Sequence, residues 1–341
     1  MHLPQKSVVA EGKIRIGPLI AIPQLLREQG IDPEGVISEA GLELLLFDDP
    51  ENVVSFASAG RLLKVCAERS RCPYFGLLAG QRTGLSSLGL VGLLARHSPT
   101  VGAALRSLVL YLHVHERGAV PALTVEHGLA VISYSIYQQG VEGITQIQDM
   151  AMAVTFNILQ GLCGPAWRPT ELLFSHHLPD RLGPYRQFFK VPLRFDMEQT
   201  AVVFPAHWLE RPVVGADPWV RRIIEQHIVE LEKLSPHDLA SQIRRVLRVL
   251  LLTHSSSARQ VAALFSLHPR TLNRRLQVQG TTLQTLIDEG RYAIARHLLE
   301  NTRMSMGQIS AVLDYSDASA FTRAFRRWAG VAPMTWRSER S

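Results

Sequence analysis

The last third of the chain repeats one pattern of residues, and this repeat constrains the fold more than any other feature of the sequence. One copy is ARQVAALFSLHPRTLNRRL, beginning at Ala258, and the other is GQISAVLDYSDASAFTRAFRRW, beginning at Gly307. Each copy has two segments of helical periodicity joined by a short polar turn. Ser257 with Gln260, and Ser305 with Gln308, have the spacing of a capping box at the start of the first helix. The pattern predicts two helix-turn-helix units, at about 257–278 and about 305–328.

The second helix of the later copy has an apolar face and a basic face. When ASAFTRAFRRWAG is placed on a helix at about 100° per residue, aromatic side chains gather on one side and arginines on the other. The apolar side contains Phe321, Ala324, Phe325 and Trp328. Gly330 follows as a helix C-cap would, and Pro333 prevents the helix from continuing. We therefore expect buried aromatics and an outward array of arginines.

A helix is predicted between the two copies, from about residue 283 to residue 299. At about 1.5 Å per residue this helix is about 25 Å long. With the widths of the flanking units added, it can hold two recognition helices roughly 34 Å apart, which is one turn of B-DNA. Both recognition helices would then enter successive major grooves on one face of a duplex.

The positive charge of the chain is concentrated in the same third. From Pro236 to the end there are 15 arginines, no lysine and 7 acidic residues, a net charge of +8. The first 235 residues contain 21 basic and 23 acidic groups, a net charge of −2. This asymmetry indicates a basic module that binds a polyanion, joined to a nearly neutral module.

The stretch from about Leu239 to Arg337 resembles the DNA-binding domain of AraC/XylS bacterial transcription regulators. The residues that give the resemblance are ARQVAALFSLHPRTLNRRL, GRYAIARHLL and QISAVLDYSDASAFTRAFRRWAGVAPMTWR. Two positions depart from the family. Asp314 stands where the family usually has glycine, and His268, a poorer helix cap, stands where it usually has serine.

The resemblance implies which side chains face DNA. Those placed toward bases are Arg270, Asn273, Arg274, Ser319, Ala320 and Arg323. Those assigned to phosphates are Thr271, Gln277, Thr322, Arg326 and Arg327. Arginine can bond bidentately to guanine and asparagine to adenine, whereas phosphate contacts position a helix without reading sequence. The alternative for each arginine is an ordinary solvated surface charge.

Residues 1–234 are predicted to form an α+β domain with an antiparallel sheet. IAIPQLLREQG, PEGVISEAGL and SFASAGRLLKVCAERS have helical spacing, and a β-hairpin is predicted in ALTVEHGLAVISYSIY around His127 and Gly128. TELLFSHH and QTAVVFP are further predicted strands. IAIPQLLREQGIDPEGVISEAGL resembles the N-terminal, arabinose-binding-like domain of a subgroup that includes regulators of ornithine use and of virulence. This resemblance implies effector sensing and self-association. Residues 235–341 then form an all-α DNA-binding domain.

The sequence gives no support for an enzyme. It lacks the GxGxxG, Walker, GxSxG and HExxH motifs, so we expect neither catalysis nor a cofactor. His113, His115 and Glu116 could suggest a metal site, but an HxH pair faces one way only in a strand, and a helix is predicted there. Three cysteines without framework spacing favour a reducing compartment. With neither a secretion signal nor a membrane-spanning segment predicted, we expect a cytoplasmic protein.

These features predict a sequence-specific transcription regulator that binds promoter DNA. The N-terminal domain is expected to form a homodimer and to bind a small molecule of unknown identity, and RNA polymerase is a further expected partner. One alternative is an architectural protein that binds DNA of any sequence, because it would share the basic surface. A second alternative is an enzyme with a DNA-binding appendage.

Overall fold

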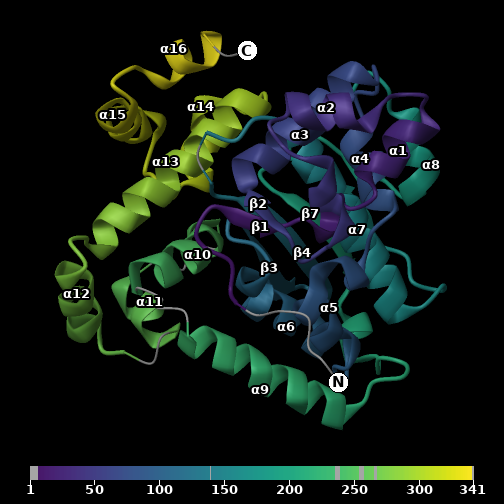
Figure 1. Cartoon of the computed structure of the whole chain (residues 1–341). Coiled ribbons are helices and arrows are strands. Elements are labelled where there is room, and N and C mark those ends of the chain that lie inside the picture. The colour runs from purple at the N-terminus through teal and green to yellow at the C-terminus, as the bar shows by residue number, and fades with distance from the viewer. Residues whose placement is uncertain (1–6, 139, 235–238, 253–256, 265–266, 340–341) are drawn as a thin grey trace. The chain divides into compact units, whose positions relative to one another are not determined.

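The computed structural model describes residues 7–138, 140–234, 239–252, 257–264 and 267–339 (Figure 1). It divides into two compact units. The first contains Met1–Leu173, Pro179–Arg194 and Gln199–Ser235, and the second contains Phe174–Leu178, Phe195–Glu198 and Pro236–Ser341. Residues 235–238 are outside the described part, so the domain boundary after residue 234 stays a prediction. No helix in the described part is both long and apolar enough to cross a membrane.

The first unit is an α/β domain whose main sheet has the strand order β3-β4-β7-β5-β6. The strands are β3 (Ala119–Glu126), β4 (Leu129–Ile136), β5 (Glu171–Leu173), β6 (Leu193–Arg194) and β7 (Thr200–Pro205). The predicted hairpin is confirmed: His127 and Gly128 have φ of 50° and 78°, as a two-residue type I′ turn requires. The predicted antiparallel sheet is confirmed for β3, β4, β7 and β5, whereas β6 pairs with β5 in parallel. With only two residues, β6 is too short to give an alternating pattern.

Helices cover this sheet, α6 packing against β3 and α7 against β4 and β7. The helices are α1 (Ile22–Glu28), α2 (Pro33–Glu39), α3 (Phe56–Arg69), α4 (Phe75–Gln81), α5 (Gly89–Arg96), α6 (Val101–Tyr111), α7 (Ile144–Cys163), α8 (Gly183–Phe189) and α9 (Pro218–Leu234), with 3-10 turns η1 (Gly17–Leu19), η2 (Leu44–Asp48), η3 (Leu85–Leu88), η4 (Leu112–Val114) and η5 (Ala206–Glu210). Helices α4 and α7 touch closely because Gly76 has no side chain. A Cβ there would lie 2.0 Å from the carbonyl oxygen of Gln146.

A second, two-stranded sheet of β1 (Lys13–Arg15) and β2 (Val53–Ser55) lies in the same unit. Ile14 of β1 forms a β-bridge with Glu116. The amide of Arg15 also donates to the carbonyl of His115, at 3.1 Å. The helix predicted through this segment ends at Tyr111 and is followed by η4, so Glu116 is held by β1 instead of by a helical turn.

The second unit is all helical in its C-terminal part. Its helices are α10 (Leu239–Leu252), α11 (Ala258–Leu264), α12 (Pro269–Val278), α13 (Leu283–Asn301), α14 (Met306–Val312), α15 (Ala318–Ala329) and α16 (Pro333–Ser338). Figure 1 shows α12 at one end of α13 and α14 with α15 at the other. One hydrophobic core joins these helices, with Leu247, Leu272, Leu286, Phe321 and Trp336 among its members. Pro333 follows the end of α15, as predicted, and is also the first residue of the short helix α16. Residues 265 and 266 of the first helix-turn-helix unit are outside the described part.

Candidate nucleic-acid interface and an apolar cavity

Helix α12 presents a polar face to solvent and an apolar face to the core. Pro269 is its first residue, and the ring Nδ1 of His268 accepts a hydrogen bond from the amide of Arg270 at 3.3 Å. The residue expected to be a poor cap therefore does cap the helix. Leu272 and Leu276 are fully buried. The exposed side chains are Arg270, Asn273, Arg274, Arg275 and Gln277, and Thr271 is half-buried.

Helix α15 has the same division in a sharper form. A carboxylate oxygen of Asp317 caps its start by accepting from the amide of Ala320 at 2.7 Å, and this hydrogen bond lowers the pKa of Asp317. Phe321 and Phe325 are fully buried, as predicted. The exposed side chains are Ser319, Arg323, Arg326 and Arg327, while Ala320, Thr322 and Trp328 are half-buried. Gly330 ends the helix with a φ of 78°.

Two of the side chains assigned to phosphates already have partners within the protein. The hydroxyl of Thr322 donates to the carbonyl of Ala318 at 2.7 Å. The guanidinium of Arg327 donates to Asp288 at 2.9 Å, although its side chain is 65% exposed. Thr322 must therefore turn its hydroxyl before it can donate to a phosphate, whereas the exposed Arg327 keeps further N–H groups that can.

The turn between α14 and α15 uses Asp314 in the left-handed conformation, with a φ of 59°. Aspartate tolerates this conformation better than most residues, which explains why Asp314 can stand at a position where glycine is usual. The guanidinium of Arg291 lies 4.9 Å from the centre of the Tyr315 ring and 3.8 Å from the carboxylate of Asp314. Arg291 comes from α13, so the linker helix supports the turn directly.

Ion pairs join the middle of helix α13 to helices α10 and α15. Glu289 pairs with Arg244 of α10 at 2.9 Å, and the neighbouring Asp288 pairs with Arg327 of α15. Exposed ion pairs of this kind contribute only about 0–1 kcal/mol each. Their effect is mainly on orientation, since the shared core supplies the stability.

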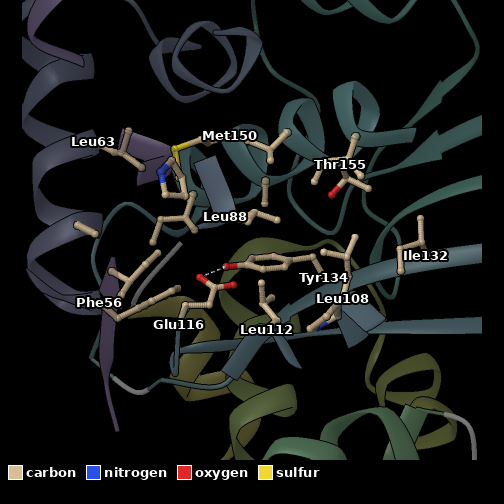
Figure 2. Close-up of a pocket in the computed structure, with 18 of the residues that line it drawn as sticks. Phe56, Leu63, Leu88, Leu108, Leu112, Glu116, Ile132, Tyr134, Met150 and Thr155 are labelled. Atoms are coloured by element: carbon tan, nitrogen blue, oxygen red, sulfur yellow. Dashed lines mark hydrogen bonds between the residues drawn. The ribbon is translucent and has the colours of Figure 1, made fainter. Parts of the chain in front are cut away.

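A cavity of about 90 Å³ lies inside the first unit, and no sequence pattern predicted it. Side chains from β1, α3, α6, β4 and α7 line it (Figure 2). Of the nineteen lining residues, only Glu116, Tyr134 and Thr155 have polar side-chain groups. Among the described residues that line this cavity there is no lysine, arginine or histidine. The space therefore suits an apolar molecule with few polar groups.

One carboxyl group faces this apolar space. Glu116 is 5% exposed, and its Oε2 accepts a hydrogen bond from the Tyr134 hydroxyl at 3.1 Å (Figure 2). Burial raises the pKa of Glu116 to about 8, and the Tyr134 hydrogen bond opposes that rise. Gly118 makes room beside it, because a Cβ there would lie 2.2 Å from the ring of Phe56.

The histidines next to Glu116 do not form a metal site with it. His113 bonds the Leu110 carbonyl at 2.9 Å and the Glu232 carboxylate at 2.6 Å. Both ring nitrogens of His115 are buried without a hydrogen-bond partner, and burial lowers its pKa to about 3, with a contribution from Arg15. Among the residues described, no group of three or more His, Cys, Asp or Glu is arranged to hold a metal ion.

Residues 30–213 match the family described as the N-terminal arabinose-binding domain of AraC transcription regulators. The chain belongs to the AraC family of transcription regulators. Residues 261–339 of this AraC-family regulator also match a helix-turn-helix domain family. The recognition of the family from sequence is thus confirmed.

Similar curated proteins extend over nearly the whole of this AraC-family regulator. The transcriptional regulator VirS of Mycobacterium tuberculosis is 29% identical over 95% of this chain and 96% of its own. The ornithine utilization regulator of Pseudomonas aeruginosa is 26% identical over 93% of this chain and 94% of its own. The solved structure of CdpR from Pseudomonas aeruginosa covers 98% of this chain and 100% of its own, with 21% identity and a TM-score of 0.47. VirS and CdpR are named as transcriptional regulators and the third protein as a regulator of ornithine utilization, and none of these is the name of an enzyme.

Proposed function

We propose that this AraC-family regulator reads a specific promoter sequence with two helices, α12 and α15. The supporting observation is that each helix buries its apolar face in one core while exposing arginines at matched positions. Arg274 and Arg323 are 49 residues apart and occupy equivalent places in the two copies. Both side chains are exposed. A guanidinium can bond bidentately to guanine in the major groove, so each arginine is proposed to select one base pair.

The other polar side chains are proposed to divide between reading and positioning. Arg270, Asn273, Ser319 and Ala320 would face bases from the N-terminal halves of the two helices. Ala320 can offer only apolar contact, for example to a thymine methyl group. The proposed phosphate contacts are Thr271, Gln277, Thr322, Arg326 and Arg327. Because phosphates are the same at every base pair, this second set would supply affinity without sequence preference.

The length of α13 supports contact with successive major grooves. Its 19 residues extend about 28 Å at 1.5 Å per residue. With the width of a flanking helix added, the two recognition helices can be about 34 Å apart, one turn of B-DNA. The ion pairs at Asp288 and Glu289 favour one orientation of the flanking helices on α13. This spacing is the geometric basis of the proposal.

The first unit is proposed to control DNA binding through a small molecule held in its cavity. The matched family is described as arabinose-binding, and one relative is named for ornithine utilization. A sugar or a diamino acid would leave several polar groups unpaired against a lining with three polar side chains. We therefore propose a mainly hydrocarbon effector. A homodimer formed by the first unit and a contact with RNA polymerase are further proposals, supported only by membership of the family.

The test is sequence selectivity. Genomic fragments bound in cells identify a candidate site, and the affinity of the full chain for that site is then compared with random DNA at one salt concentration. A specific regulator should prefer its site by ~10³–10⁷-fold. Equal affinity for both would instead establish the alternative, a protein that binds DNA of any sequence.

A further inference from the structure

We propose that the cavity binds an uncharged, mainly hydrocarbon molecule through one acceptor oxygen, as in a ketone or an alcohol, which accepts a hydrogen bond from the carboxyl group of Glu116. The inference rests on the proposed function, because it names the chemical class of the effector. It begins from the arrangement in Figure 2, where the Glu116 carboxyl and the Tyr134 hydroxyl meet among apolar side chains.

The Tyr134 hydrogen bond occupies one oxygen of the Glu116 carboxyl group and leaves the other oxygen to carry a proton. Tyr134 donates to Oε2, so a neutral acid that keeps this hydrogen bond has its hydrogen on Oε1. Among the described residues, no other side-chain hydrogen bond reaches Glu116. An O–H group that faces an apolar cavity without an acceptor is unfavourable. A ligand oxygen in the cavity would remove that cost, whereas a purely hydrocarbon ligand would not.

The surroundings keep this carboxyl neutral at ordinary pH. Burial raises the pKa of Glu116 to about 8, so at pH 7 the acid exceeds its anion by about ten to one. The charged or titratable neighbours do not supply a counter-charge. Arg15 of β1 pairs with Glu51 at 3.5 Å, Arg117 approaches Glu11 at 4.0 Å, burial keeps His115 uncharged, and burial raises the pKa of Tyr134.

Other ligand classes fit this lining less well. A carboxylate would meet a neutral acid and no cationic side chain among the lining residues. An ammonium ligand would need Glu116 ionised and both charges desolvated, and the attraction in such buried pairs often fails to repay the desolvation. An uncharged oxygen needs neither change. A neutral buried carboxylic acid that donates to a substrate oxygen is an established way for proteins to use a raised pKa.

Butanone and sec-butylamine are suitable probes, since they have similar shape and differ in the polar group. Their dissociation constants for the full chain are measured by ligand-detected NMR titration at pH 7 and pH 9. Butanone should bind at pH 7 and about tenfold more weakly at pH 9, because Glu116 then loses its proton. Glu116→Gln should keep butanone binding and lose the pH dependence, since an amide still donates and still accepts from Tyr134. Glu116→Leu should bind butanone at least tenfold more weakly.

The control is Glu126→Gln, which makes the same substitution at the exposed end of β3 and should leave both titrations unchanged. Infrared spectra should show a protonated carboxyl band that Glu116→Gln lacks and that disappears as the pH rises through about 8. Tighter binding of sec-butylamine than of butanone, or undiminished butanone binding in Glu116→Leu, would overturn the inference. If promoter selectivity persists in either case, only the effector class is wrong and the proposed DNA recognition stands.

Discussion

Replacing Phe325 with alanine should unfold the second helix-turn-helix unit. The first compact unit of the chain, which contains the sheet, should stay folded. The ring is fully buried. Its centre lies 5.7 Å from that of Tyr292 on α13, 5.8 Å from Phe321 on α15 and 5.8 Å from Trp336 on α16. Removing a buried phenylalanine typically costs about 3–5 kcal/mol. Because three aromatic contacts worth about 0.5–1.5 kcal/mol each disappear together, we expect a loss near the upper end.

This loss is a large fraction of the free energy of unfolding of a domain, which is about 5–15 kcal/mol. Urea unfolding of the full chain, followed by tryptophan fluorescence and circular dichroism, measures it. With an m-value of about 1–2 kcal/mol/M, the urea midpoint of the second helix-turn-helix unit should fall by roughly 2.5–5 M. The transition of the first unit should not move.

A matched control lies two residues away on the same helix. Arg323→Ala removes an exposed side chain and should change the free energy of unfolding by less than about 0.5 kcal/mol, yet weaken promoter binding. Phe325→Ala should lose both stability and binding. An unchanged unfolding midpoint in Phe325→Ala would refute the assignment of this ring to the core, and with it the reason that the arginines face outward.

Three further predictions concern recognition and pH. Arg274→Ala or Arg323→Ala should each weaken binding to the preferred site by roughly 1–3 kcal/mol and relax the preference at one base pair, measured by affinity for single-base variants of the site. Arg327→Ala should weaken binding to promoter and random DNA alike and make the slope of log affinity against log salt shallower by about 0.9; a loss confined to the promoter would contradict the phosphate assignment. The first unit should lose stability as the pH rises from 6.5 to 8, because burial raises the pKa of Glu116 from its ordinary value of 4.5 to about 8, so the folded state retains a proton that the unfolded state has released. His115, with a folded pKa of about 3, affects stability mainly below pH 6.5. Glu116→Gln should therefore make the denaturation midpoint nearly independent of pH between 6.5 and 8, and an unchanged dependence on pH would count against the burial of Glu116.

The DNA-binding unit was largely predictable because its signals are local. The capping box at Ser305 and Gln308 is present in the structure, and the spacing of Phe321 and Phe325 correctly placed both rings in the core. Helical periodicity and capping depend on residues three or four apart. The predicted base-facing and phosphate-facing roles concern DNA and stay predictions, although the structure places Arg270, Asn273 and Arg323 on the exposed surface.

The cavity could not be predicted because its residues are distant in the sequence. Phe56 of α3, Glu116 beside β1 and Tyr134 of β4 meet only after the sheet and its helices have formed. The strand pairing that holds Glu116 depends on β1, which has three residues and no clear alternation. The nearest sequence signal was Glu116 in YLHVHERG, where the two neighbouring histidines suggested a metal site instead of a cavity.

The most direct test of the central claim is hydroxyl-radical footprinting of the full chain on its preferred promoter site. Two recognition helices joined by α13 should protect two patches of backbone on one face of the duplex, centred about one helical turn, 10–10.5 base pairs, apart. Arg274→Ala should weaken one patch and Arg323→Ala the other. A single protected patch, or two patches on opposite faces, would contradict the account.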